Sequence, residues 1–140
     1  MDGDGRARVS QADYEALAEF RLALRLFTDF SRQAARREGL PPMQHQALLA
    51  IRGAPLGQQV SIGSLAKSLC SKPQSTSELV TRMERDGLVT RRTNHEDARQ
   101  IWLEITPRGL AVLDRLSSVH RNELRRLRPA LERLLAQFDL

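Results

Sequence analysis

Apolar side chains recur every three or four residues from Ser10 to about Glu38, which predicts a long helix. Ser10 and Asp13 are suited to cap its start. The apolar positions form two stripes, of which Leu17, Phe20, Leu24 and Phe27 make the first and Leu22, Leu26 and Phe30 the second. So wide an apolar arc exceeds what one core face needs. The helix therefore either fills the centre of its own domain or also packs against a second copy of the chain.

Shorter helices follow the breaks at Gly39 and at the Pro41-Pro42 pair. The first of these should turn Met43, Ala47, Leu48 and Ile51 inward. After a loop rich in glycine and proline, the segment SIGSLAKSL predicts a helix capped by Ser61, with Ile62, Leu65, Ala66 and Leu69 as its apolar face.

A tight connection of three residues, Cys70-Ser71-Lys72, leads to the next helix. Pro73 suits its first position, and Gly87 suits its C-terminal stop after about Asp86. Its inward side chains are expected to be Leu79, Val80 and Met83. Two short helices joined in this way predict a helix-turn-helix.

Two alternating segments, 88–92 and 100–106, predict a β-hairpin directly after that second helix. A hairpin in this position is the wing of a winged helix. Arg91 and Arg92 lie at its base and Arg99 lies beyond its tip, where they can reach phosphates or a minor groove. Asp97 cannot favour DNA directly, but it can hold the tip or orient a neighbouring arginine.

A long helix should begin after the hairpin, with Thr106 as N-cap and Pro107 at its first position. Its apolar stripe is Leu110, Leu113, Leu116, His120, Leu124 and Leu127. Pro129 is expected to interrupt it, and a last helix should carry Leu131, Leu134, Leu135 and Phe138. These apolar helical segments lie beyond the winged helix, and they either fold back on its core or pair with a second copy of the chain. The heptad-like spacing of the leucines favours a second copy.

Composition narrows the class of protein. The chain has 140 residues, enough for one domain, with only 4% aromatic residues, so a helical core is favoured and an aromatic platform for RNA is not. A net charge of +5 allows a polyanionic partner. No run of apolar residues is long enough to predict a membrane span. Residues 1–9 are expected to be a disordered lead-in and not a signal sequence. A single cysteine fits a reducing compartment. The expected location is the cytoplasm.

Motifs for catalysis, cofactors and metals do not occur in the sequence. There is no nucleophile elbow, phosphate loop or dinucleotide fingerprint, so an enzyme is not expected. His45, His95 and His120 are too far apart to suggest a metal site. His120 fits a core position, whereas His45 fits either an effector pocket or the surface. Cys70 is expected to be a buried turn residue, with a reactive redox-sensing thiol as the alternative.

The start of the fourth helix, Pro73-Gln74-Ser75-Thr76-Ser77-Glu78, is small and polar. Such side chains permit close approach to base edges and phosphates in a major groove. A solvated surface helix gives the same pattern. A winged helix used for protein interaction without DNA is a further alternative, although such domains usually lose the basic residues of the wing.

The segment SIGSLAKSLCSKPQSTSELVTRMERDGLVTRRTNHEDARQIWLEITPRG resembles the MarR family of bacterial transcriptional regulators. Three features carry the resemblance: LVTRMERDGLV at the end of the fourth helix, Asp97-Ala98-Arg99 in the wing, and LEITPRG before the next helix. The resemblance covers roughly residues 10–138. It implies a mainly α fold with a small β-hairpin wing, in a single domain over residues 10–140, with a winged helix at about 41–106 and dimerisation helices at about 10–38 and 107–138.

The same resemblance implies a homodimer that binds palindromic double-stranded DNA. It further implies a repressor that is released by a small phenolic or other anionic effector, in a pocket between the dimerisation and DNA-binding parts. By position, Arg99 would enter the minor groove and Asp97 would steady it. The full set of expected DNA-binding residues is Lys72, Gln74, Ser75, Ser77, Glu78, Thr81, Arg82, Arg91, Arg92, Asp97 and Arg99.

Within that set, Gln74, Ser75, Ser77 and Glu78 would face the major groove, and Thr81 and Arg82 would lie nearer the backbone. Glu78 departs from the family, where a basic or neutral residue is more usual. Its carboxylate either accepts a hydrogen bond from cytosine N4 or repels phosphate.

Overall fold

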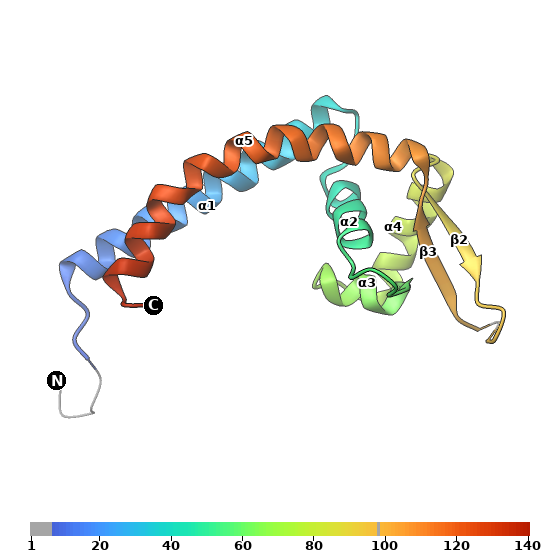
Figure 1. The fold of residues 1–140 in the computed structure, drawn as a ribbon, viewed down its shortest axis with the longest axis horizontal. Helices are drawn as coiled ribbons and strands as arrows, with labels where there is room; N and C mark the ends of the chain where they lie inside the picture. The colour runs from blue at the N-terminus through green and yellow to red at the C-terminus, as the bar shows by residue number, and fades with distance from the viewer. Residues whose placement is uncertain (1–6, 98) are drawn as a thin grey trace. The chain divides into compact units, whose positions relative to one another are not determined.

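A computed structural model describes residues 7–97 and 99–140, which form two compact units. One unit combines the chain up to Gln33 with Ser118–Leu140, and is called the helix unit below. The other, Ala34–Ser117, is called the winged-helix unit. Helix α1 (Gln11–Arg37) and helix α5 (Pro107–Gln137) each contribute to both units (Figure 1). The expected class, mainly helical with a small sheet, is confirmed.

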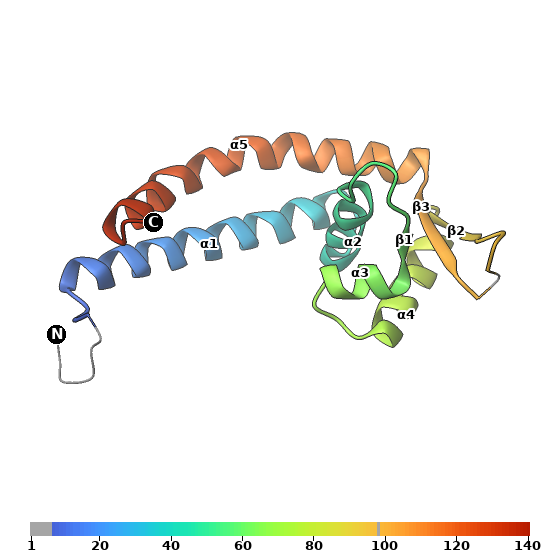
Figure 2. The same cartoon turned by 60° about the horizontal axis from the view of Figure 1, so that its bottom comes forward.

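In the helix unit, α1 and α5 run antiparallel and side by side (Figures 1 and 2). The cap predicted at the start of α1 is present. The amide of Asp13 donates to Oγ of Ser10 over 3.1 Å, and the amide of Ser10 donates to Oδ2 of Asp13 over 2.8 Å. These reciprocal bonds satisfy amides that no helical carbonyl reaches. Among the described helices, none has the length and apolar character that a bilayer crossing needs.

His120 lies in the core of the helix unit, as its spacing predicted. It is 8% exposed, and its Nε2 lies 2.8 Å from Oγ of Ser31. The rings of Phe27 and Phe30 approach the imidazole edge-on, with centroids 5.9 and 5.3 Å away. A hydrogen-bonded imidazole between aromatic rings is a packed core residue.

Two polar contacts join the far ends of these helices. Nε of Arg133 donates to Oε2 of Glu19 over 2.8 Å, and Nε2 of Gln137 donates to Oδ1 of Asp13 over 2.8 Å. The Arg133 bond lowers the pKa of Glu19, and the Ser10 amide, followed by Gln137, lowers the pKa of Asp13. A lowered carboxyl pKa stabilises the folded state above the ordinary pKa, and this stabilisation is lost as pH falls through the folded value. Both contacts therefore weaken in acid.

The predicted break at Pro129 is wrong, because α5 continues through this residue to Gln137. Proline cannot donate to the carbonyl four residues earlier, and it normally kinks or ends a helix. Here packing outweighs that loss. Ala130, next to the proline, is buried, and Leu127 and Leu134 on the same side of the helix are half-buried. Burial of an amphipathic face supplies most of the stability of a helix.

The winged-helix unit contains three short helices and a sheet. The helices are α2 (Pro42–Arg52), α3 (Ile62–Ser68) and α4 (Pro73–Arg85), and the strands are β1 (Val60–Ser61), β2 (Val89–Thr93) and β3 (Ile101–Ile105). The expected two-stranded hairpin is incomplete, because the sheet has three strands in the order β1-β3-β2. Val60 pairs with Leu103 and Ser61 with Trp102, both antiparallel. A strand of two residues is too short to produce the alternation by which strands are predicted.

Three of the four side chains expected to face inward from α2, Ala47, Leu48 and Ile51, are buried, and the fourth is not. Met43 was expected to face inward, but it is 47% exposed. Gln44 and His45 are buried instead, each at 3% exposure. The buried positions 44, 47, 48 and 51 follow helical spacing, so Gln44 and not Met43 takes the first inward position. The burial of His45 also excludes the surface position that was one of its two alternatives.

The turn between α3 and α4 depends on a left-handed residue. Cys70 has φ of 51°, and the amide of Ser71 donates to the carbonyl of Ala66 over 2.9 Å. This bond closes the end of α3 in the way that usually requires glycine. Cys70 is exposed, so the expectation of a buried turn residue is wrong. At the other end of α3, Ser61 and Ser64 form the predicted cap, here as a reciprocal capping box.

The chain that leaves α4 packs closely against the start of α5. Oγ1 of Thr106 donates to the carbonyl of Gly87 over 2.6 Å and accepts from the amide of Gly109 over 3.0 Å. A Cβ on Gly109 would overlap the carbonyl oxygen of Leu88 and lie 2.9 Å from Cγ1 of Ile105. The glycine of the LEITPRG segment is therefore required by backbone packing.

Gly109→Ala should lower the free energy of unfolding by about 1–3 kcal/mol, because the added methyl group must displace backbone. Urea unfolding followed by circular dichroism measures the change. Gly63→Ala is the matched control, since a Cβ there meets only Oγ of Ser61, at 3.8 Å. This control should stabilise the protein by up to about 1 kcal/mol, as alanine favours helix over glycine. Equal effects of the two substitutions would contradict the packing argument.

Candidate nucleic-acid interface

Helix α4 buries one side and leaves the other free. Thr76, Val80 and Met83 are buried, at positions separated by four and three residues. The opposite side carries polar side chains only. Of the residues expected to bind DNA, the exposed ones are Lys72, Gln74, Ser75, Glu78, Thr81, Arg82, Arg92, Asp97 and Arg99, and the half-buried ones are Ser77 and Arg91. The structure brings the α4 residues onto one helix, next to the hairpin that holds the others (Figure 2).

Arg91 joins the wing to α4. Its Nη2 donates to the carbonyl of Ser77 over 3.1 Å and to Oγ1 of Thr81 over 2.9 Å. Its amide donates to Oε2 of Glu84 over 3.3 Å. Ser77, Thr81 and Glu84 lie at helical spacing, so one side of α4 faces strand β2 along its length. Arg91 thus sets the position of the hairpin relative to the helix, a role that its sequence position at the base of the wing did not reveal.

Arg92 points elsewhere, because it forms an ion pair with Glu104 on the neighbouring strand. The two side chains are 59% and 43% exposed. The partners Glu84 and Glu104 were both missed in the sequence. The pairing of Thr90 with Glu104 and of Arg92 with Trp102 places Glu104 diagonally from Arg92, and knowledge of that register could have found it.

Hydrogen bonds within the loop fix the tip of the wing. Oδ1 of Asp97 accepts from the amide of Arg99 over 3.0 Å, and the carbonyl of Asp97 accepts from the amide of Gln100 over 3.0 Å. The side chains of Asn94 and Gln100 bond across the loop over 2.9 Å. Of the two roles expected for Asp97, the structure has the one that holds the tip, through backbone and not through a guanidinium. Ala98 of the same triplet lies outside the described residues.

Arg99 is exposed beyond this braced loop. Since no hydrogen bond or ion pair of its guanidinium occurs in the described part of the chain, all of its donors face solvent. Three wing arginines therefore occupy three different states. One is bound to α4, one is paired across the sheet, and one is free at the tip.

Metal chemistry has no support in residues 7–97 and 99–140, where no group of three His, Cys, Asp or Glu side chains could hold an ion. The lone thiol of Cys70 is exposed at the turn before α4.

Comparison with known proteins identifies the winged-helix part. Residues 38–100 match the model of the MarR family. That segment contains α2, both helices of the helix-turn-helix and the strands β1 and β2, and it ends just before β3. Residues 38–100 are thus similar to the MarR family. The resemblance first seen at the end of α4 and in the wing is thereby confirmed. No curated protein matches the chain in sequence.

Solved structures of MarR-family proteins share this fold. AbsC of Streptomyces coelicolor, a MarR family transcriptional regulator, is 21% identical, with a TM-score of 0.69 over 87% of this chain and 82% of that one. Another MarR family transcription regulator is 27% identical, with a TM-score of 0.65 over 90% of this chain and 91% of its own. MepR of S. aureus in a complex with DNA is 18% identical, with a TM-score of 0.66 over 77% and 78%.

In the winged-helix unit, Arg91→Ala should lower the free energy of unfolding by about 1–2 kcal/mol, since it removes two hydrogen bonds from a guanidinium to α4. Arg92→Ala is the matched control, because its exposed ion pair should contribute less than about 1 kcal/mol. Thermal unfolding of both variants at the same salt concentration makes the comparison. If Arg92→Ala proves the more destabilising, Arg91 does not hold the wing on the helix.

Proposed function

We propose that this protein is a sequence-specific, double-stranded DNA-binding transcriptional regulator that acts as a homodimer. One observation carries the proposal: the free polar face of α4 lies beside a braced wing whose tip arginine has no partner among the residues that the structure describes. Proteins of the same fold include MepR, whose structure in a complex with DNA is known. We assign the winged helix to about residues 41–106 and the dimerising helices to about 10–38 and 107–138.

In the proposed complex, α4 enters a major groove and the wing lies along the adjacent minor groove. Gln74 and Ser75 supply hydrogen-bonding groups near the start of the helix, where residues of a recognition helix contact base edges. Lys72 and Arg82 supply positive charge for phosphates. Arg99 suits the minor groove, because its negative potential attracts a free guanidinium. Arg91 acts indirectly, by holding the wing at the correct distance from α4.

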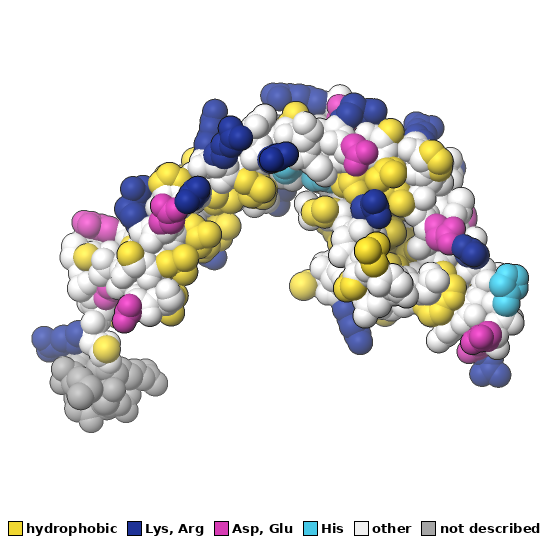
Figure 3. All heavy atoms as spheres, in the orientation of Figure 1, with side chains coloured by type: hydrophobic (Ala, Val, Ile, Leu, Met, Phe, Trp, Pro, Cys, Tyr) yellow, Lys and Arg dark blue, Asp and Glu magenta, His cyan; other side chains and the backbone are white. Residues whose placement is uncertain are grey.

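The helix unit supports a dimer because it leaves large apolar side chains in solvent. Figure 3 shows hydrophobic atoms exposed along this unit. The residues concerned are Tyr14, Leu17, Leu22, Leu26, Val119, Leu124, Leu131 and Leu135, which are 40–60% exposed. Burial of one leucine side chain stabilises by about 1.5–3 kcal/mol. A second copy that covers these stripes gives two recognition helices related by symmetry, which is what a palindromic site requires.

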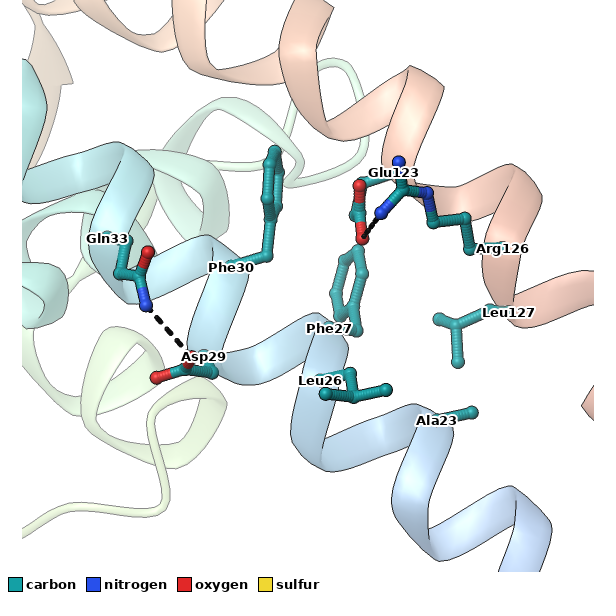
Figure 4. A pocket seen from close by; sticks show the side chains of 9 residues that line it. All are labelled: Ala23, Leu26, Phe27, Asp29, Phe30, Gln33, Glu123, Arg126 and Leu127. Atoms are coloured by element: carbon teal, nitrogen blue, oxygen red, sulfur yellow. Dashed lines mark hydrogen bonds and ion pairs between the residues drawn. The ribbon is translucent and has the colours of Figure 1, made fainter.

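Repression relieved by a small molecule is the mode of regulation that we infer. A cavity of about 260 Å³ lies between α1 and α5 within the helix unit (Figure 4). Its apolar lining is Ala23, Leu26, Phe27, Phe30 and Leu127, and its polar lining is Asp29, Gln33, Glu123 and Arg126. Because Arg126 is paired with Glu123 at 3.6 Å, this lining suits a phenol that donates to a carboxylate better than it suits an anion.

Arg99→Ala should weaken binding to every duplex by roughly 1–3 kcal/mol, because it removes a positive charge that the negative potential of the minor groove attracts. Fluorescence anisotropy with labelled duplexes measures the affinity, and the titration is repeated at low and at high salt. Wild-type affinity should fall steeply with salt as counterions are released. Arg52→Ala, which removes an exposed arginine of α2, should leave the affinity unchanged. If the wild-type protein does not bind duplex DNA even at low salt, the proposal is wrong. The alternative, a winged helix that binds another protein, is then favoured.

Leu131→Glu combined with Leu135→Glu should convert the dimer to a monomer, because the new carboxylates lie in the stripe that the second copy covers. Both leucines are exposed, at 41% and 40%, so the fold of one chain loses little. Sedimentation equilibrium measures the mass. Ser118→Glu combined with Arg125→Glu adds carboxylates on the side of α5 away from these apolar side chains and should leave a dimer. A dimeric leucine variant would rule out this interface.

A further inference from the structure

Glu78 brings a negative charge to a helix face that is proposed to meet a polyanion. It is exposed in the second turn of α4. Each residue turns a helix by about 100°, so position 78 lies opposite the buried Thr76, Val80 and Met83. Glu78 therefore occupies the central line of the free face. When a helix lies in a major groove, side chains on that line point to the base edges, and those on its flanks lie nearer the phosphates.

The carboxylate of Glu78 is available for recognition. Among the residues that the structure describes, it forms no hydrogen bond and no ion pair, although Arg82 follows it at the spacing of a helical ion pair. The hydroxyl of Thr81, a neighbour on the same face, already forms two hydrogen bonds within the protein. Oγ1 of Thr81 accepts from Arg91 and donates to the carbonyl of Ser77 over 3.0 Å. Glu78 is thus a free acceptor in the middle of the face.

A carboxylate can only accept hydrogen bonds, and this restricts its partners. Phosphates repel it. In the major groove guanine presents the acceptors N7 and O6, and thymine presents the acceptor O4. Adenine offers the N6 donor, but its N7 acceptor lies directly beside that group. Cytosine offers the N4 donor without a neighbouring acceptor of its own, so it is the base edge that suits an isolated carboxylate.

We propose that Glu78 is a specificity-determining residue that accepts a hydrogen bond from N4 of one cytosine in each half-site. This inference rests on the proposed function, since it requires α4 to lie in the major groove. The same charge lowers the affinity for every duplex without that cytosine. Glu78 therefore increases the ratio of specific to non-specific affinity, whereas a basic residue would raise both affinities.

Selection of binding sites from random duplexes tests the assignment, with wild-type protein, Glu78→Gln, Glu78→Ala and the charge-matched control Asp114→Asn. Asp114 is exposed on α5, away from the proposed interface. Wild type and the control should enrich a cytosine at the same position of both half-sites. Glu78→Gln should change that base to adenine, which an amide contacts through N6 and N7. Glu78→Ala should show no preference there.

Titrations with the selected duplex, and with duplexes in which that single base pair is replaced, give the size of the preference for cytosine. Wild type should prefer the cytosine by roughly 5- to 150-fold, and Glu78→Ala by less than about twofold. If Glu78→Gln keeps the wild-type preferences and binds all duplexes more tightly, the carboxylate faces phosphate and the proposal is wrong. If wild type selects a sequence in which no position responds to Glu78, it is also wrong. A wild-type protein that selects nothing contradicts the proposed function itself, and the cytosine contact with it.

Discussion

The winged helix depends on one close approach, between the chain that leaves α4 and the first turn of α5. The hydroxyl of Thr106 bonds to Gly87 on one side and to the amide of Gly109 on the other. Gly87 takes a left-handed conformation that lets the amide of Leu88 cap α4, and Gly109 has no side chain where Leu88 passes. Helix, strand and following helix are thus joined through backbone contacts, which few substitutions can preserve.

Electrostatics in the interface follow from which charges are already occupied. A guanidinium that is bound within the fold supplies order, and one that faces solvent supplies attraction to a polyanion. Arg91 is bound within the fold and Arg99 faces solvent, although the two lie in one small hairpin. The braced loop below Arg99 reduces the conformational entropy that binding would otherwise remove. A modest net charge is therefore compatible with a strong local attraction.

Sequence reasoning located most elements because they rest on local rules. Caps at Ser10, Ser61 and Thr106 and the turn at Gly87 were read from a few neighbouring residues, and all are present. The errors arose where distant partners decide. Strand β1 exists only because β3 pairs with it, and Pro129 stays helical because neighbouring side chains are buried. Likewise, the choice between Met43 and Gln44 depends on what lies against α2, and the bonds of Arg91 depend on a helix fourteen positions away in sequence.

The exposure of Cys70 has a practical consequence. It is the single cysteine of the chain, and it lies at the turn that immediately precedes α4. A maleimide dye or a nitroxide would attach there and nowhere else, with no need to engineer a thiol. In an assembly of two chains, the pair of probes would report the separation of the two turns by energy transfer or electron resonance, with and without other molecules present. Changes in the distance between the two turns can thus be measured with the wild-type sequence.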